Sequence, residues 1–234
     1  VTSYQKKLWL KLKKYLITGI IMNDFNGQIV YPEKRDSIKN ALIFLHGYGA
    51  NADDLINIGL KWKDKLRNTI FISPNAPFKC DWSDGAFQWF DLTSIAPDKI
   101  SEGLIKAGPF FNELVDKIKI KFALNDSQIL FFGFSQGAMM GLYHLCKRKN
   151  PCAGLLAYSG LLFLDNDFDS SISSKFPIRL YHGKNDEVID SDNSVKSYEK
   201  LKSLGFVVDY RIQENLGHGI DNEGLEFGEN FIQK

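Results

Sequence analysis

The chain has 234 residues, of which 44% are hydrophobic and 24% charged, a balance typical of a folded globular protein rather than a disordered or collagen-like one. Its 29 basic and 28 acidic residues leave a formal charge of +1, so no overall field attracts nucleic acid. The three cysteines lack the spacing of metal ligands, and so few thiols are typical of a reducing compartment. We therefore expect no nucleic-acid partner, no metal and no disulfide framework.

Residues 1–21 differ in composition from the rest of the chain. Lysines alternate there with apolar and aromatic side chains, namely Lys6, Lys7, Lys11, Lys13 and Lys14 with Leu8, Trp9, Leu10, Leu12 and Tyr15. Such a segment can make a peripheral membrane contact, because lysines meet anionic headgroups while apolar side chains enter the interface. The favoured interpretation is instead a first strand or extension packed on the domain, or translated sequence upstream of a start at Met22. A secretory signal is disfavoured, since the apolar part is short and no small-residue cleavage site follows.

From residue 40 onward, short apolar runs alternate with longer amphipathic stretches, the pattern of βαβ units with a mainly parallel sheet. Strands are predicted at residues 41–45, 69–72, 128–132, 154–158, 178–181 and 207–213, with two or more additional strands within 14–31. Helices are predicted at 52–65, 102–122, 136–147, 191–204 and 224–232. Ile105, Phe111 and Ile118 recur at roughly helical intervals in the second helix. No repeat or linker divides the chain, so we expect a single domain over residues 22–234, preceded by a basic extension or first strand.

The segment from Gly133 to Gly137 carries the strongest chemical signal. It reads Gly-Phe-Ser-Gln-Gly between a predicted strand and a predicted helix, the G-x-S-x-G pattern of a nucleophile elbow. The glycines allow a turn tight enough to strain the backbone of the serine. The following helix offers N–H donors to a developing oxyanion at its amino end. Ser135 is therefore the predicted nucleophile.

A serine hydroxyl needs a base within hydrogen-bonding reach and a group that orients this base. The chain order serine, acid, histidine of this fold excludes His46 and His144, and leaves His182 and His218. His182 ends a predicted strand, and the turn after it is better used to present an acid. We therefore assign the base to His218, which lies between two glycines in a loop after the last predicted strand.

Asp186 is the predicted orienting acid. It lies in the loop at the carboxyl end of a predicted strand, where its carboxylate would fix the tautomer of His218. Glu187 and Asp190 are rivals in the same loop, and they could equally be solvated charges. The same applies to the acids after the preceding strand, Asp165, Asp167 and Asp169.

The oxyanion hole is expected to combine two backbone N–H groups. One belongs to Gln136, just after the nucleophile, and the other to the loop after the strand at 41–45. That loop reads His-Gly-Tyr-Gly from residue 46, so Tyr48 is the expected second donor and His46 a structural residue.

Residues 74–93 form a long irregular segment rich in aromatic side chains. Exposing all of them would leave a large apolar patch, so some must line a groove or pack beneath the segment. We expect Trp82, Trp89 and Phe90 to contact the substrate, with Leu161 supplying an apolar contact from the loop after the strand at 154–158.

Several ordered motifs together resemble the phospholipase/carboxylesterase family, which includes acyl-protein thioesterases. They are Leu-His-Gly-Tyr-Gly from residue 45, Pro-Asn-Ala-Pro from 74, Trp-Phe-Asp from 89, the elbow, His-Gly-x-x-Asp from 182 and Gly217-His218. The resemblance covers residues 22–234. It implies an α/β-hydrolase fold, with a mostly parallel central sheet and helices on both faces, and places the family's catalytic roles on Ser135, Asp186 and His218.

The same resemblance implies a cytoplasmic serine esterase without a cofactor, acting on carboxylic esters, lysophospholipids or S-acylated cysteines, and homodimers in some members. Residues 1–21 have no counterpart in the family. A different function would be a peripheral membrane protein with a vestigial hydrolase core, which predicts vesicle binding through residues 1–21 and no reaction of Ser135 with a fluorophosphonate. The complete set of triad candidates favours the enzyme.

Overall fold

A seven-stranded sheet forms the centre of the molecule, with the strand order β1-β3-β2-β6-β7-β8-β9. The computed structural model describes residues 26–92, 94 and 96–232. The strands are β1 (Gly27–Val30), β2 (Asn40–Leu45), β3 (Thr69–Pro74), β6 (Ile129–Phe134), β7 (Gly154–Tyr158), β8 (Ile178–Gly183) and β9 (Val208–Gln213). β1 pairs antiparallel with β3 and all other neighbours are parallel, which confirms the predicted mostly parallel sheet.

Every strand predicted from residue 40 onward is present, within two residues at each end. For β2, β3, β6, β7 and β8 the prediction succeeds because these strands are covered on both faces, so their sequences are nearly continuous apolar runs. The edge strand β9 is half-buried or exposed at every residue. All residues of β3, β7 and β8 are buried. Of the strands expected within residues 14–31, the structure contains β1, while residues 1–25 lie outside the described residues.

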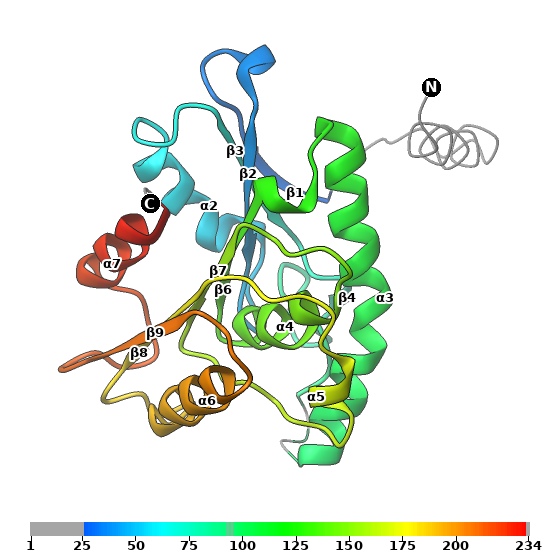
Figure 1. Cartoon of the computed structure of the whole chain (residues 1–234), viewed down its shortest axis with the longest axis vertical. Helices are drawn as coiled ribbons and strands as arrows, with labels where there is room; N and C mark the ends of the chain where they lie inside the picture. Colours follow the sequence, from blue (N-terminus) through cyan, green and yellow to red (C-terminus); the bar gives the residue numbers. More distant parts are fainter. Residues whose placement is uncertain (1–25, 93, 95, 233–234) are drawn as a thin grey trace.

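Helices cover both faces of the sheet (Figure 1). They are α2 (Ala52–Trp62), α3 (Pro97–Phe122), α4 (Gln136–His144), α5 (Phe168–Ser171), α6 (Asp192–Ser203) and α7 (Asn222–Ile232). The helices α3, α4, α5 and α6 pack on one face, and α2 and α7 pack on the other, so two apolar clusters sandwich the sheet. Short 3-10 turns occur at Arg35–Ser37, Asp126–Gln128 and Leu145–Lys147, the last replacing the final predicted turn of α4.

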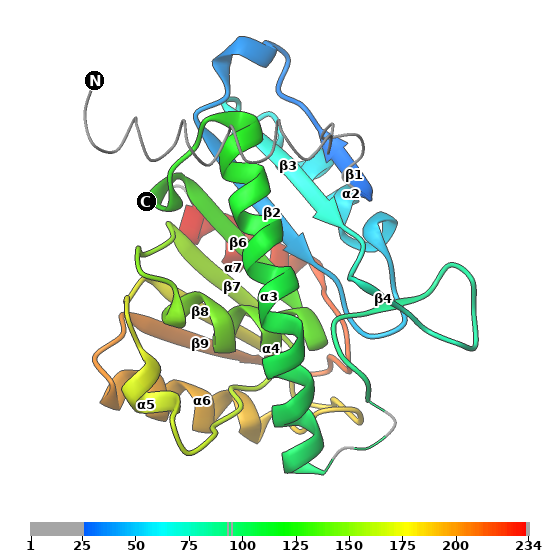
Figure 2. The ribbon, with the colours of Figure 1, turned by 90° about the vertical axis from the view of Figure 1, so that its right-hand side faces the viewer.

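Helix α3 is 26 residues long and crosses the strands in front of the sheet (Figure 2). It begins at Pro97, earlier than predicted, because proline is well tolerated at the first helical position. Its buried face consists of residues spaced three or four apart: Leu104, Ala107, Gly108, Phe111, Val115 and Ile118. Ile105, which the apolar pattern had included, is 59% exposed.

The parallel strands β2, β3, β6, β7, β8 and β9 all end at one edge of the sheet, so the loops that follow them meet there. The loop after β3 contains a small hairpin of β4 (Phe78–Lys79) and β5 (Phe87–Gln88), which the sequence did not predict. Two-residue strands are too short to show an alternating pattern. No helix among the described residues is long and apolar enough to cross a bilayer.

Candidate active site

Ser135 lies between β6 and α4 with a strained backbone, at φ 53° and ψ −117°. The turn is closed by two glycines. A Cβ at Gly137 would lie 1.9 Å from the carbonyl oxygen of Leu45, and one at Gly133 would lie 2.6 Å from the carbonyl oxygen of Gly137. The N–H of Ser135 donates to the carbonyl of Tyr158 on the neighbouring strand β7, at 2.9 Å. The sheet thus fixes a strained serine at the carboxyl end of β6.

Asp186 has a fully buried carboxylate in the loop after β8. Its Oδ1 accepts the backbone N–H groups of Val188 and Ile189, both at 2.9 Å. Its Oδ2 accepts Nδ1–H of His218 at 2.7 Å. Burial by itself would raise the pKa of Asp186, but the hydrogen bonds from Ile189, His218 and Val188 outweigh it and hold this pKa below its usual value. The carboxylate therefore stays ionised beside the imidazole.

His218, in the loop after β9, is oriented by this hydrogen bond. Because Nδ1 faces Asp186, Nε2 is the ring nitrogen left for a reacting group. The ring lies against that of Phe134, the residue before Ser135, with centroids 5.0 Å apart. Between the described side chains of Ser135 and His218 the structure has no hydrogen bond, and such contacts often tighten only when substrate binds.

The rival acids occupy other positions. Glu187 and Asp190 are both exposed, and the carboxylate of Asp190 accepts the backbone N–H of Asp192 at the start of α6. The structure therefore places Asp186, and neither rival, beside His218.

Two N–H groups lie where an oxyanion hole is expected. In the described part of the chain, neither the backbone N–H of Tyr48 nor that of Gln136 has a hydrogen-bond acceptor. The loop that carries Tyr48 passes close to the serine, since a Cβ at Gly47 would lie 3.4 Å from Cβ of Ser135. Both donors are therefore available beside Ser135.

A buried histidine holds this loop in place. Nδ1–H of His46 donates to the carbonyl of Gly47 at 2.7 Å, and Nε2 accepts the backbone N–H of Ala76 at 3.0 Å. Burial lowers the pKa of His46 to about 4, against the opposing effect of the Gly47 carbonyl. The ring is thus neutral at pH 7 with a fixed tautomer, and the indole N–H of Trp89 secures the carbonyl of His46 at 3.0 Å.

The side chain of Gln136 connects the elbow to the segment after β5. Its Oε1 accepts the backbone N–H of Trp89 at 2.8 Å, and its Nε2 donates to the carbonyl of Phe90 at 2.7 Å. Gln136 is completely buried, and Trp89 is 1% exposed. Trp89, which was expected to contact substrate, therefore donates its backbone N–H to Gln136 and its indole N–H to the carbonyl of His46. Sequence reasoning missed the side-chain role of Gln136, for which the only signal was an amide in an otherwise apolar helix start.

A cavity of about 660 Å³ lies beside the loop of residues 46–49 that carries Tyr48, which we call the oxyanion loop. Its lining combines aromatic side chains with charges of both signs, and includes Tyr48, Phe78, Trp82, Phe90, Asp81, Asp91, Lys99, Glu102 and Lys106. Trp82 is 63% exposed, and its ring centroid lies 6.5 Å from that of Tyr48. Two of the expected contact residues, Trp82 and Phe90, line this cavity, whereas Leu161 is half-buried and packs against the core.

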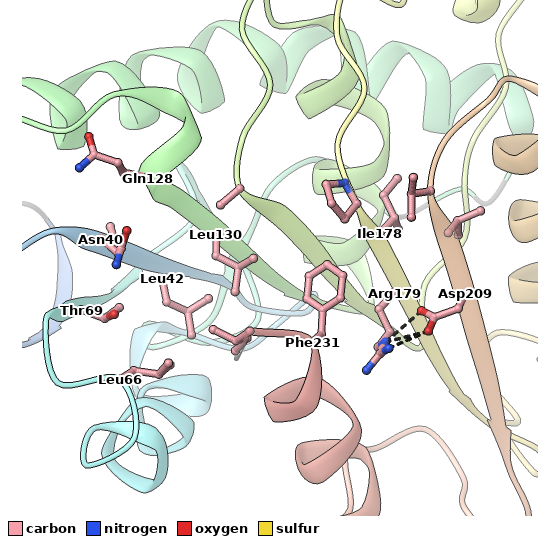
Figure 3. A pocket seen from close by; sticks show the side chains of 16 residues that line it. Asn40, Leu42, Leu66, Thr69, Gln128, Leu130, Ile178, Arg179, Asp209 and Phe231 are labelled. Carbon is pink, nitrogen blue, oxygen red and sulfur yellow. Dashed lines mark hydrogen bonds and ion pairs between the residues drawn. The ribbon is translucent and has the colours of Figure 1, made fainter. Parts of the chain in front are cut away.

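A second cavity, of about 550 Å³, lies at the opposite edge of the sheet (Figure 3). It is lined by the first residues of the strands and by the end of α7, including Asn40, Thr69, Ile178 and Phe231. Arg179 at its wall is neutralised by Asp209, with Nε and Nη2 donating to the carboxylate at 2.7–3.1 Å. Ser135 follows the last residue of β6, so this cavity is separate from the candidate active site.

The strained serine, the Asp186–His218 pair and the parallel sheet together define an α/β-hydrolase-like fold. The chain matches the phospholipase/carboxylesterase family model over residues 26–234. It belongs to the phospholipase/carboxylesterase family and is a carboxylic ester hydrolase.

Named relatives agree with this assignment. Acyl-protein thioesterase 1 of Neurospora crassa is 26% identical over 208 residues, covering 82% of this chain and 84% of the relative. A probable carboxylesterase SOBER1-like of Arabidopsis thaliana is 27% identical, covering 86% and 80%. The crystal structure of esterase PE8 superposes with a TM-score of 0.85 at 30% identity, covering 89% of this chain and 97% of that one.

Proposed function

We propose that the protein hydrolyses acyl esters, including lysophospholipids, small carboxylic esters and the thioesters of S-acylated proteins, through an acyl-enzyme on Ser135. The observation that carries this proposal is the 2.7 Å hydrogen bond between His218 and Asp186, at the same sheet edge as the strained Ser135. The Ser135 oxygen attacks the acyl carbon while His218 takes its proton and returns it to the leaving oxygen or sulfur. Water, activated in turn by His218, then releases the acid.

The oxyanion of each tetrahedral intermediate would be stabilised by the N–H groups of Tyr48 and Gln136. Both groups lack another acceptor in the described part of the chain, so binding the oxyanion costs no existing hydrogen bond. One such donor typically contributes about 3 kcal/mol to transition-state stabilisation.

The strand order suggests where each half of the substrate lies. The loops after β2 and β3 are on one side of Ser135, and those that carry Asp186 and His218 are on the other. The leaving group must lie near His218 to receive its proton. The acyl group therefore extends towards the aromatic cavity lined by Phe78, Trp82 and Phe90, whose volume of about 660 Å³ accommodates a long chain.

Labelling with a fluorophosphonate probe tests the nucleophile. We expect the probe to attach to the peptide containing Ser135, and Ser135→Ala to abolish both labelling and turnover of p-nitrophenyl esters without lowering the unfolding midpoint. Ser203→Ala, at the exposed end of α6, is the matched control and should behave as the wild type. A folded wild-type protein that neither reacts nor turns over any ester would favour the vestigial-core alternative.

The names of the relatives support acyl esters and thioesters as the substrate class. A panel of acyl chain lengths, offered as matched oxygen esters, thioesters and lysophospholipids, would rank the substrates. Hydrolysis of none of them by an enzyme that reacts with fluorophosphonate would reject this substrate class while keeping the nucleophile.

We also propose a cytoplasmic location and a peripheral membrane contact through residues 1–21, with the family resemblance suggesting a homodimer. Asn26, the first described residue, accepts two hydrogen bonds from Asn75, which directly follows β3. The described part of the chain therefore begins at the sheet edge that carries Ser135. Sedimentation with anionic vesicles, with and without residues 1–21, tests the contact, and equal sedimentation of both forms would reject it.

A further inference from the structure

His182 is a completely buried histidine at the end of β8 that the proposed reaction does not use. Its Nε2 lies 3.0 Å from Oδ2 of Asp186, the same oxygen that accepts the hydrogen bond from His218. Its Nε2 also lies 2.8 Å from the carbonyl oxygen of Ile189, and its Nδ1 lies 2.7 Å from Oγ of Ser194 in α6. Two imidazoles therefore converge on one carboxylate oxygen.

The contacts determine the tautomer of His182. A carbonyl oxygen only accepts hydrogen bonds, so the contact with Ile189 requires a proton on Nε2. Burial lowers the pKa of His182, against the opposing effects of the Ile189 carbonyl and Asp186, so the ring is neutral at pH 7. Nδ1 is then unprotonated and accepts the hydroxyl proton of Ser194, which holds the Nε2–H tautomer.

We propose that His182 is a positioning residue, whose single Nε2–H is shared between the carbonyl of Ile189 and Oδ2 of Asp186 and thereby sets both the orientation of that carboxylate and its basicity towards His218. The carboxylate then accepts hydrogen bonds from Val188, Ile189 and His218 and also shares the N–H of His182. A carboxylate saturated in this way cannot rotate without losing several hydrogen bonds at once.

The direction of the effect on His218 follows from the shared oxygen. A donor on Oδ2 draws electron density away from the side that faces His218, so Asp186 stabilises the imidazolium less than a carboxylate lacking that donor would. Removing the donor should strengthen the attraction between Asp186 and the protonated form of His218 and loosen the orientation of its ring. The titratable groups acting on His182 are Asp186 and His218, while Ser194 of α6 is not titratable in this range.

A matched pair of amide variants separates positioning from packing. The amide nitrogen of glutamine can occupy the place of Nε2, whereas that of asparagine is one methylene too short to reach Asp186. We expect His182→Asn to lower kcat about tenfold, the size of one transition-state hydrogen bond, with KM unchanged and the acid limb of the kcat/KM profile moved to higher pH. His182→Gln should restore both the rate and the position of that limb.

Serines of α6 give an independent readout. Ser194→Ala removes the donor that fixes the tautomer, so it should move the acid limb in the same direction by a smaller amount. Ser197→Ala is the control, because Ser197 is also a buried serine of α6 but bonds Leu162 and Asn193 instead. If neither amide variant folds, this serine pair decides the question.

The inference rests on the proposed function, and its failure can be told apart from the failure of that function. A wild type without esterase activity rejects the proposed reaction. An active wild type whose acid limb is the same in His182→Asn, His182→Gln and Ser194→Ala rejects the positioning role alone, whatever their stability.

Discussion

Gln136 serves the site with two different parts of one residue. Its backbone N–H is the proposed oxyanion donor, while its buried amide holds Trp89 and Phe90 through one hydrogen bond each. Because Trp89 in turn secures the carbonyl of His46, the elbow and the loop that carries Tyr48 are connected by successive buried hydrogen bonds. Such a network fixes the relative positions of the N–H groups of Tyr48 and Gln136 better than two unconnected loops would.

Gln136→Met tests this connection. Methionine preserves the backbone N–H and the approximate volume but leaves the N–H of Trp89 and the carbonyl of Phe90 unpaired, at about 1–3 kcal/mol for each buried group. We expect a lower free energy of unfolding in urea and a kcat reduced roughly tenfold, with a smaller change in KM. A variant as stable and as active as the wild type would contradict the role of the side chain.

Trp82 is the most exposed aromatic side chain of the proposed acyl cavity, at 63%. Trp82→Ala should raise KM for long-chain p-nitrophenyl esters and change KM for the acetate ester little, because only a long chain reaches the ring. Stability should change by less than about 0.5 kcal/mol, as for other exposed positions. Val207→Ala, 76% exposed at the opposite edge of the sheet, is the control. An equal effect on short and long esters would place the acyl chain elsewhere.

At the scale of elements, Asn51 connects α2 to the hairpin of β4 and β5. Its Oδ1 accepts the N–H of Asp53 and caps α2, while its Nδ2 donates to the carbonyl of Gly85 in the hairpin turn. The hairpin also pairs with the oxyanion loop, since the N–H of Gly49 donates to Phe87. One side chain therefore couples a helix start to the cavity wall.

Two substitutions of Asn51 separate its capping of α2 from its contact with Gly85. Asn51→Ala should cost about 1 kcal/mol of stability through the lost cap and also weaken substrate binding. Asn51→Asp keeps a capping oxygen but lacks the donor to Gly85, so it should recover stability, as measured by urea unfolding, without recovering KM. Equal KM values for both variants and the wild type would show that the contact with Gly85 does not shape the cavity.

The sequence predicted some elements of the fold and missed others, depending on how strongly burial and backbone geometry restrict the residue types in each. Strands buried on both faces produce apolar runs, and the elbow needs glycines at Gly133 and Gly137, so both were predicted from sequence. The hairpin was missed because its strands have two residues each. Ile105 was assigned to the wrong face of α3, since apolar character alone does not identify which of two adjacent residues is buried.

The residues of the candidate site also divide into those that the sequence predicted and those that it did not. Ser135, Asp186 and His218 follow from motif order, because the order of strand ends along the sheet edge is fixed by the fold. The contact of His182 with Asp186 depends on the path of the chain from His182 to Ile189, which turns back so that the backbone of Ile189 contacts both residues. No spacing rule in the sequence gives that path.

At the scale of the whole molecule, buried histidines make the free energy of unfolding depend on pH. His46 holds the oxyanion loop, and His144 packs against Phe111 and donates Nε2–H to the carbonyl of Leu104, which joins α4 to α3. Burial lowers the pKa of each to about 4, with the Gly47 and Leu104 carbonyls opposing it. Both rings are therefore neutral in the folded protein at pH 7 and must gain charge in acid.

The direction of the change in stability follows from the number of protons that the folded and the unfolded chain bind. Between pH 6.5 and about 4 the unfolded chain binds protons on these histidines that the folded chain does not, so the free energy of unfolding falls as the pH falls through this window. Full protonation would remove on the order of 3 kcal/mol per histidine. Asp186 and Asp126, whose pKa values are lowered, add losses only below about pH 3.8, in a separate window.

Urea unfolding at pH 7.5, 6 and 4.5 should therefore give a free energy of unfolding that falls with the pH. The decline should be smaller in His144→Gln, whose amide can still donate to the Leu104 carbonyl but does not titrate. Constant stability from pH 7.5 to 4.5 would mean that neither ring stays neutral through burial.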